Sequence, residues 1–354
     1  MTLDRYVLKL LLVRTIAAVI ILITLVQVLE LLDVTSQILD RGLGLAGIGK
    51  YSLLRLPGQF QQTAGLAVLV GSIFTFTHLS RTSEMIVIRA TGANIYRVLR
   101  MMAPVAFAVA ALDFVVAAEI TPRTQDELTH WMAATAPAEK KTPPKPHWFR
   151  LGPDLVLVSA ASEDGTRLQG LHIYRRDAAR NLTLEIAAPV ATAEPGGWRL
   201  QGAVTTRVGE DRSSLFGPAD QDWRTALSSG DVVRLFRAGE LISTGAAASA
   251  LARVAPTDRS PGFYETRLNR TFAEPLAALV MLLLAAPAAL ASLRSDQAMK
   301  LFVFGLTSGI LFMVSDGLLT ALGETSALPP VLAAWSAPVA FTALAVTVLL
   351  YAEG

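Results

Sequence analysis

Residues 11–32 read LLVRTIAAVIILITLVQVLELL, a long apolar stretch in which only Arg14 and Glu30 are charged. About 20 mostly apolar residues cross a hydrocarbon core roughly 30 Å thick as an α-helix. We therefore predict a membrane-spanning helix here. A cleaved signal peptide is the alternative, because Arg5 and Lys9 precede the run. The run is longer than an ordinary signal-peptide core and no small-residue cleavage motif closes it, which favours an uncleaved helix.

Five further stretches share this length and composition, at residues 62–79, 98–118, 271–293, 301–322 and 331–351. Charged residues are concentrated elsewhere, because 34 of the chain's 60 Asp, Glu, Lys and Arg residues lie in positions 121–266. That region is roughly 23% charged, close to the 25% of a soluble domain, whereas the rest is roughly 12% charged. The chain is 52% hydrophobic and lacks cysteine, which excludes a single soluble domain, a disordered chain and a disulfide-stapled module.

The charge-rich middle of the chain has the pattern of short β-strands. Segments rich in Val, Ile, Leu, Thr and Tyr alternate with turn residues, at 154–159, 168–175, 182–186, 198–208 and 232–236. We predict an α-helical membrane protein with six transmembrane helices plus an all-β, jellyroll-like domain inserted between helices 3 and 4. The expected division is residues 1–120 for helices 1–3, 121–266 for the β domain and 267–354 for helices 4–6.

Basic residues in the short connections predict the orientation, because Lys and Arg favour the cytoplasmic side. The connections that would share one side with the N-terminus carry Arg5, Lys9, Arg14, Arg81, Arg89, Arg97, Arg100, Arg294 and Lys300. Two connections would lie on the opposite side. The one at 323–330 carries no basic residue, and the one at 33–57 carries Arg41, Lys50 and Arg55, which Asp33 and Asp40 partly offset. We expect both termini to be cytoplasmic and the β domain to lie outside. A net charge of +2 without a basic stripe predicts no nucleic-acid partner.

A short amphipathic helix is predicted near residues 82–92, on the cytoplasmic side between spans two and three. Thr82 or Ser83 caps it, and Glu84 in its first turn suits the helix dipole. Its apolar face is formed at helical spacing by Met85 and Ile88, with Val87 as a further candidate. Gly92 is placed to end the helix. A helix lying on lipid is the alternative interpretation. The acid at its front and the arginines at its ends favour a groove on another protein.

Chemical motifs are weak elsewhere. The segment Gly44–Tyr51 matches part of a phosphate-binding loop, but Tyr51 stands where a Ser or Thr would meet Mg²⁺ and no strand precedes it. The four histidines lack the spacing of a metal site. We predict no catalytic residue, no metal and no cofactor.

Asp113 and Asp316 lie inside predicted spans, where each charge costs about 2.5–3.5 kcal/mol. Either they make polar contacts inside the bundle or they lie at helix ends near the outer interface.

The chain resembles the LptF/LptG (YjgP/YjgQ) permease family of lipopolysaccharide export along nearly its whole length, and its N-terminal features resemble the LptG subunit more than LptF. The resemblance rests on Leu3-Asp-Arg-Tyr6, Leu31-Leu-Asp33, Leu56-Pro57, Ser83-Glu84 with Ala90-Thr-Gly92, Gly170-Leu-His-Ile-Tyr174, Pro275-Leu276 and Leu328-Pro-Pro330. It implies a multi-pass subunit of the bacterial inner membrane that belongs to an ATP-driven ABC transporter and is not itself an enzyme. The implied transporter extracts lipopolysaccharide and passes it to a periplasmic bridge.

The resemblance also implies partners and roles. The partners are a sister LptF-like permease in a heterodimer, a cytoplasmic ABC ATPase dimer, a periplasmic jellyroll bridge protein, a membrane-anchored LptC-like protein and lipopolysaccharide. The role of ATPase coupling falls to Glu84, with Arg81, Met85, Ile88, Arg89 and Gly92 around it. Family members resemble one another in basic residues that would meet lipid A phosphates, but this chain has Glu30, Gly58 and Thr129 there.

Nearby cations offer a substitute for those basic residues, because phosphate needs positive charge more than one fixed position. We hypothesise that Arg41, Lys50, Arg55 and Arg123 bind the lipid; otherwise the cognate lipid carries fewer phosphates. A membrane-anchored periplasmic binding or scaffold module without transport activity is the alternative function, but an anchor has no use for the helix that carries Glu84. An intramembrane hydrolase lacks a paired nucleophile and base.

Overall fold

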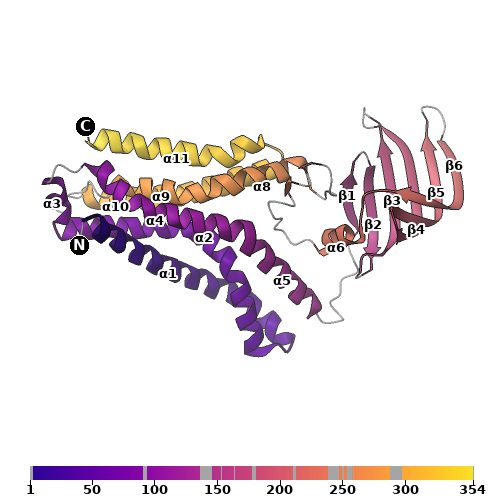
Figure 1. Ribbon diagram of the computed structural model, residues 1–354, viewed down its shortest axis with the longest axis horizontal. Helices are drawn as coiled ribbons and strands as arrows, with labels where there is room; N and C mark the ends of the chain where they lie inside the picture. The colour runs from indigo at the N-terminus through magenta and orange to yellow at the C-terminus, as the bar shows by residue number, and fades with distance from the viewer. Residues whose placement is uncertain are drawn as a thin grey trace. The chain divides into compact units, whose positions relative to one another are not determined.

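The computed structural model describes residues 3–90, 94–135, 146–152, 154–162, 164–177, 181–209, 213–237, 247–248, 251–252, 257, 259–287 and 297–353. The chain divides into two compact units (Figure 1). The helical unit is Met1–Leu128 with Glu265–Gly354, and the β unit is Thr129–Tyr264.

Six helices of the described chain are long and apolar enough to cross a membrane, as predicted. The six spans, and the short helix α3 between the second and the third, are built from these elements: α1 (Leu3–Asp40), α2 (Gly44–Arg81), α3 (Glu84–Ala90), α4 (Ile95–Val115), the π-helix η1 (Val116–Ile120), α5 (Thr121–Ala134), α8 (Pro261–Ala273), the 3₁₀ turn η3 (Glu274–Leu276), α9 (Ala277–Ala285), α10 (Gln297–Glu324) and α11 (Pro330–Glu353). The third span runs without a break through α4, η1 and α5, and the fourth through α8, η3 and α9.

The connection between the first two spans is much shorter than the sequence indicated. We expected a connection over residues 33–57, but α1 continues to Asp40 and α2 begins at Gly44. Only three residues join them, and Gly42 adopts a positive φ of 72° that suits glycine. Each of these helices has 38 residues, or roughly 57 Å at 1.5 Å per residue, which exceeds the hydrocarbon core. Both helices therefore extend beyond the hydrocarbon core, and hydropathy does not mark the polar turns that lie outside it.

The core of the helical unit forms where α1 and α4 pack on α2, and where α9 packs against α2, α4 and α11 (Figure 1). The central helix α9 is entirely apolar, and most of its side chains are buried. At one crossing, α1 lies so close to α2 that a Cβ at Gly71 would come within 2.6 Å of Thr15 Oγ1. The bundle is thus packed through small residues, as is common between helices in membranes.

The β unit contains one antiparallel sheet whose six strands follow each other in sequence order (Figure 1). They are β1 (His147–Leu151), β2 (Asp154–Ala161), β3 (Arg167–Arg176), β4 (Leu182–Glu194), β5 (Gly197–Val208) and β6 (Ser213–Arg224). Alternate side chains of β2, β3 and β5 are buried, which gives the sheet one apolar face. Trp198 is the largest fully buried side chain, and its Nε1 donates to the Leu227 carbonyl at 2.9 Å.

One predicted strand was wrong. Residues 232–236 belong to helix α6 (Ser229–Arg237), and Val232 and Leu235 pack into the core of the β unit. A reciprocal cap starts this helix, because Ser228 Oγ accepts from the Asp231 amide at 3.1 Å while Asp231 accepts from the Ser228 amide at 3.1 Å. A five-residue apolar run suits a strand or a helix equally, and the cap decides between them. The predicted strands at 154–159, 168–175, 182–186 and 198–208 are confirmed, whereas β1 and β6 were missed.

Candidate functional site

The short helix α3 lies between α2 and α4 at the end of the bundle that also holds both termini (Figure 1). A tight turn precedes it, with Ser83 at a positive φ of 61°. The Ser83 carbonyl accepts hydrogen bonds from the amides of Ile86 and Val87 at 3.1 and 3.3 Å, which starts the helix at Glu84. This places the acid of the motif at the tip of the helix, next to the positive end of its dipole.

The apolar residues of α3 divide into two faces. Met85 and Ile88, at 5% and 3% exposure, belong to the core of the helical unit. Ile86 and Val87, at 68% and 65% exposure, point away from the core. The two predicted face residues therefore anchor the helix, and the surface open to another protein is formed by Glu84, Ile86 and Val87. The sequence pattern found the amphipathic helix, but it did not show which side the bundle covers.

Glu84 has a partner within the chain. The hydroxyl of Tyr6, in the first turn of α1, donates to Glu84 Oε1 at 3.2 Å. Arg81 ends α2 with an exposed side chain. Gly92 and the side chain of Arg89 lie outside the described residues.

Three of the four cations proposed for lipid contact are paired with acids. Arg55 binds Glu30 through two hydrogen bonds of 2.9 and 2.5 Å, and Gln59 adds a third to the same carboxylate at 3.0 Å. Two further ion pairs join Lys50 to Glu127 at 2.8 Å and Arg123 to Glu119 at 2.6 Å. Arg41 lies in the connection that follows α1. The acids therefore offset most of the positive charge that a phosphate would meet here.

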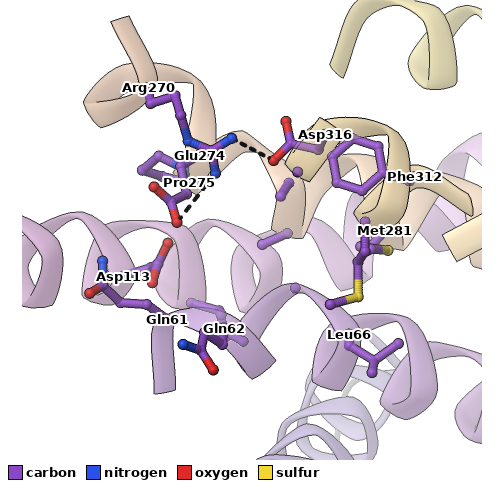
Figure 2. A pocket seen from close by; sticks show the side chains of 17 residues that line it. Gln61, Gln62, Leu66, Asp113, Arg270, Glu274, Pro275, Met281, Phe312 and Asp316 are labelled. Atoms are coloured by element: carbon purple, nitrogen blue, oxygen red, sulfur yellow. Dashed lines mark hydrogen bonds and ion pairs between the residues drawn. The ribbon is translucent and has the colours of Figure 1, made fainter. Parts of the chain in front are cut away.

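Asp113 and Asp316 line one cavity of about 380 Å³ inside the bundle (Figure 2). Two residues that the sequence interpretation overlooked, Arg270 and Glu274, complete the polar wall. Arg270 contacts Asp316 at 2.8 Å and Glu274 at 3.6 Å. The i, i+4 spacing of Arg270 and Glu274 at the start of the fourth span was the available signal. Of the two interpretations left open for the aspartates, this placement favours contacts inside the bundle.

The described residues contain no group of three or more His, Cys, Asp and Glu side chains that could hold a metal ion. The Gly44–Tyr51 segment, which resembled a phosphate-binding loop, forms the first turns of α2. Its glycines are therefore part of a helix. The features that remain are a polar helix tip at one end of the bundle, paired charges at the far end of α1 and α2, and an internal charged cavity.

Comparison with known proteins gives one consistent result. The family model "Lipopolysaccharide export system permease LptF/LptG" matches residues 5–351. The lipopolysaccharide export system permease protein LptG of Escherichia coli K12 is 22% identical over 343 residues, which cover 94% of this chain and 93% of that protein. LptG of Haemophilus influenzae Rd is 23% identical over 331 residues, which cover 92% and 90%. With its six long apolar helices, this chain is a multi-pass membrane protein that belongs to the lipopolysaccharide export system permease family LptF/LptG.

Proposed function

We propose that this chain is the permease subunit of an ATP-driven ABC transporter that extracts lipopolysaccharide from the bacterial inner membrane and passes it to a periplasmic bridge. The tip of α3 is the observation that carries the proposal. Glu84 stands at the start of a helix whose Met85 and Ile88 are fixed in the bundle core, while Ile86 and Val87 remain exposed. A separate cytoplasmic ATPase supplies the hydrolysis and docks on this tip.

The packing of α3 supports a mechanical role. A helix of seven residues is not stable by itself, so its conformation depends on its contacts with the bundle. Because Met85 and Ile88 are buried in the core of the helical unit and α3 packs against α2, a displacement of α3 moves the bundle with it. Movement of an ATPase dimer would thus reach the membrane-embedded part of the chain. Glu84 contributes the charge that a cationic groove recognises, and Arg81 flanks it.

The orientation and partners follow from the same proposal. The basic residues Arg81, Arg97 and Arg100 lie at the α3 end of the bundle, which supports a cytoplasmic position for that end and a periplasmic β unit. The chain pairs with a sister LptF-like permease and with an ATPase dimer. The β unit hands lipid to a jellyroll bridge and a membrane-anchored LptC-like protein. Arg41, Lys50, Arg55 and Arg123 contact the lipid head group, and the last three exchange their acidic partners for phosphate.

Co-expression with the ATPase and the sister permease of the same genome tests the coupling site. We expect the ATPase to co-purify with the wild type, and Glu84→Ala to weaken binding by about tenfold or more, since a hydrogen bond to a charged group contributes about 1.5–3 kcal/mol. Asp33→Ala is the matched control, because Asp33 is an exposed acid of α1. Intact assembly and lipid-driven ATP turnover in Glu84→Ala would contradict the coupling role. Absence of the ATPase from wild-type preparations would favour the anchored scaffold module.

A separate assay tests the lipid contacts. The four single alanine variants at Arg41, Lys50, Arg55 and Arg123 are assembled with the ATPase, and their lipid-stimulated ATP turnover is compared with that of the wild type. At least one of the four is expected to lose most of the stimulation while keeping turnover without lipid. Unchanged stimulation in all four would refute the assignment and favour a lipid with fewer phosphates.

A further inference from the structure

The cavity inside the helical unit has a polar and an apolar side (Figure 2). Its apolar side is formed by Leu66, Met281 and Phe312 among others. Its polar side collects one cation and three carboxylates from four elements of the bundle. They are Asp113 from α4, Arg270 from α8, Glu274 from η3 and Asp316 from α10.

The single cation is already engaged. The Arg270 guanidinium contacts Asp316 at 2.8 Å and Glu274 at 3.6 Å, and it also donates to Thr320 Oγ1. Its side chain is 14% exposed, and those of Asp316 and Glu274 are 20% and 32% exposed, so all three are at least partly shielded from water. One positive charge therefore faces two carboxylates before Asp113 is counted. If every group were ionised, the four side chains would carry a net charge of −2 within the spans.

Asp113 is the carboxyl that makes no ion pair with a described residue, although the positive charge of Arg270 acts on it as well as the negative charge of Glu274. Its side chain is 5% exposed, and its buried Oδ1 makes no hydrogen bond to any residue that the structure describes. Figure 2 shows its carboxyl group directed toward that of Glu274, and the two groups are near enough for their charges to interact. An ionised carboxylate in this position would be desolvated, unpaired and opposed by a like charge.

The remaining neighbours offer no positive charge to Asp113 in the described cavity wall. The second span presents the amides Gln61 and Gln62, and α9 presents Ala277, Ala278 and Met281. Glu324, at the end of α10, adds negative charge near Arg270. The described residues also form no cluster suited to a metal ion. The cation that this arrangement accepts most readily is a proton, which removes the charge of Asp113 without needing further ligands.

We propose that Asp113 is a proton-binding site inside the bundle, whose carboxyl group is neutral in the resting protein and faces the carboxyl group of Glu274 across the cavity. A bound proton keeps α4 and η3 together, because it removes the repulsion between the carboxyl groups of Asp113 and Glu274. Loss of the proton places two like charges in one cavity and favours separation of these elements.

Infrared difference spectroscopy tests the proposal on the full chain in lipid nanodiscs, with the subunits that co-purify with it. At neutral pH, the wild type minus Asp113→Asn spectrum is expected to show one carbonyl band of a protonated carboxylic acid. The band is expected to shift when aspartate is labelled with ¹³C and to disappear as the pH is raised. Asp33→Asn is the matched control and is expected to leave the band unchanged, because Asp33 is an exposed acid.

Each other result overturns the assignment. Absence of a carboxylic-acid band at neutral pH would show that Asp113 is ionised in the resting protein. A band that survives Asp113→Asn but is lost in Glu274→Gln would place the proton on Glu274. Carboxylate bands that change when Na⁺ is replaced by a bulky organic cation at constant pH would identify a metal cation as the ligand. Asparagine matches protonated aspartate in size and charge, so the variant is expected to fold. If it does not, the aspartate label in the wild type still decides whether the band exists.

Discussion

The hydroxyl of Tyr6 donates a hydrogen bond of 3.2 Å to Oε1 of Glu84, joining the first turn of α1 to the first residue of α3 across 78 positions of sequence. The proposed coupling acid is therefore positioned by the N-terminal helix as well as by its own turn. Because α3 has only seven residues, such tertiary contacts determine where its tip lies.

Tyr6→Phe removes this hydroxyl and is expected to weaken the association of the ATPase by up to about tenfold, since the net contribution of one hydrogen bond is about 0.5–1.5 kcal/mol. The readout is the concentration of ATPase that saturates ATP turnover of the assembled transporter. Tyr96→Phe is the control, because Tyr96 is an exposed tyrosine of α4. Tighter binding in Tyr6→Phe would show instead that Tyr6 competes with the ATPase for Glu84.

The crossing of α1 and α2 at Thr15 and Gly71 gives a prediction about stability. A Cβ at Gly71 would lie 2.6 Å from Thr15 Oγ1 and 3.0 Å from the Thr15 backbone, so Gly71→Ala forces the helices apart. We expect a loss of about 1–3 kcal/mol. Gly49→Ala in the same helix meets nothing within 4 Å and is expected to stabilise by about 0.4–1 kcal/mol. Thermal unfolding of the two variants in one detergent measures the opposite signs, and equal effects would contradict the close crossing.

Trp198 provides the matching test in the β unit. It is 2% exposed, and its Nε1–H satisfies the Leu227 carbonyl. Trp198→Phe is expected to cost about 1–3 kcal/mol by leaving that carbonyl unpaired, and Trp198→Ala about 3–5 kcal/mol by adding a cavity. Chemical denaturation of the full chain, monitored by proteolysis of the β unit, measures the loss of stability in each variant. Trp148→Ala is the control at 47% exposure, and an equal loss there would contradict a central role for Trp198.

A pH effect is expected in the turn between β2 and β3. Asp164 accepts hydrogen bonds from Ser162 Oγ at 2.5 Å and from the Thr166 amide and hydroxyl at 3.1 and 2.7 Å, which lower the pKa of its carboxyl to about 2. Because this folded-state pKa lies below the usual value near 4, the stabilisation is complete above about pH 4 and disappears as the pH falls toward 2.

Asp164→Asn is therefore expected to lower the unfolding midpoint of the β unit at neutral pH, and the gap to the wild type should close on acidification. Unfolding of the full chain, monitored by proteolysis of the β unit at several pH values, gives this gap directly. A gap that stays constant between neutral and acid pH would show that the carboxylate charge contributes nothing to the turn.

The membrane part of the fold was predictable because the bilayer sets the length of each apolar run, and all six runs became helices. The ends of those helices were not predictable from the same signal. Residues 33–40 of α1 are partly polar and lie beyond the length that the bilayer requires, so hydropathy suggested a connection where the helix continues. In the β unit, the cap at Ser228 and Asp231 distinguished a helix from a strand, and it was present in the sequence.

The candidate site shows a similar division. Glu84 was found from local sequence, because its motif, its turn and its helix are contiguous. Its contact with Tyr6, the burial of Met85 and the convergence of Asp113 with Arg270 all join segments that are distant in the chain. Local patterns carry no information about such contacts. The pairing of Arg55 with Glu30 belongs to the same class, and it bears directly on the proposed lipid site.

Glu30→Gln tests whether that pair limits the binding of phosphorylated lipid. The change removes the negative charge of the carboxylate to which Arg55 donates two hydrogen bonds, while glutamine keeps the size of the side chain. Both partners are partly buried, at 25% and 21% exposure, so the released guanidinium should attract phosphate more strongly than a fully exposed arginine would. We expect roughly threefold to tenfold tighter binding of a phosphorylated lipid A, with no change for its dephosphorylated form.

Fluorescence titration of the purified chain with the two lipids measures this difference, and the gain should shrink as the salt concentration rises. Adding Arg55→Ala to Glu30→Gln is expected to abolish the gain, because no cation is then released. Glu194→Gln is the control, since it frees Arg199 from its 3.5 Å ion pair in the β unit. Equal affinity of wild type and Glu30→Gln for phosphorylated lipid would remove Arg55 from the lipid site and leave its pair with Glu30 as a structural link between α1 and α2.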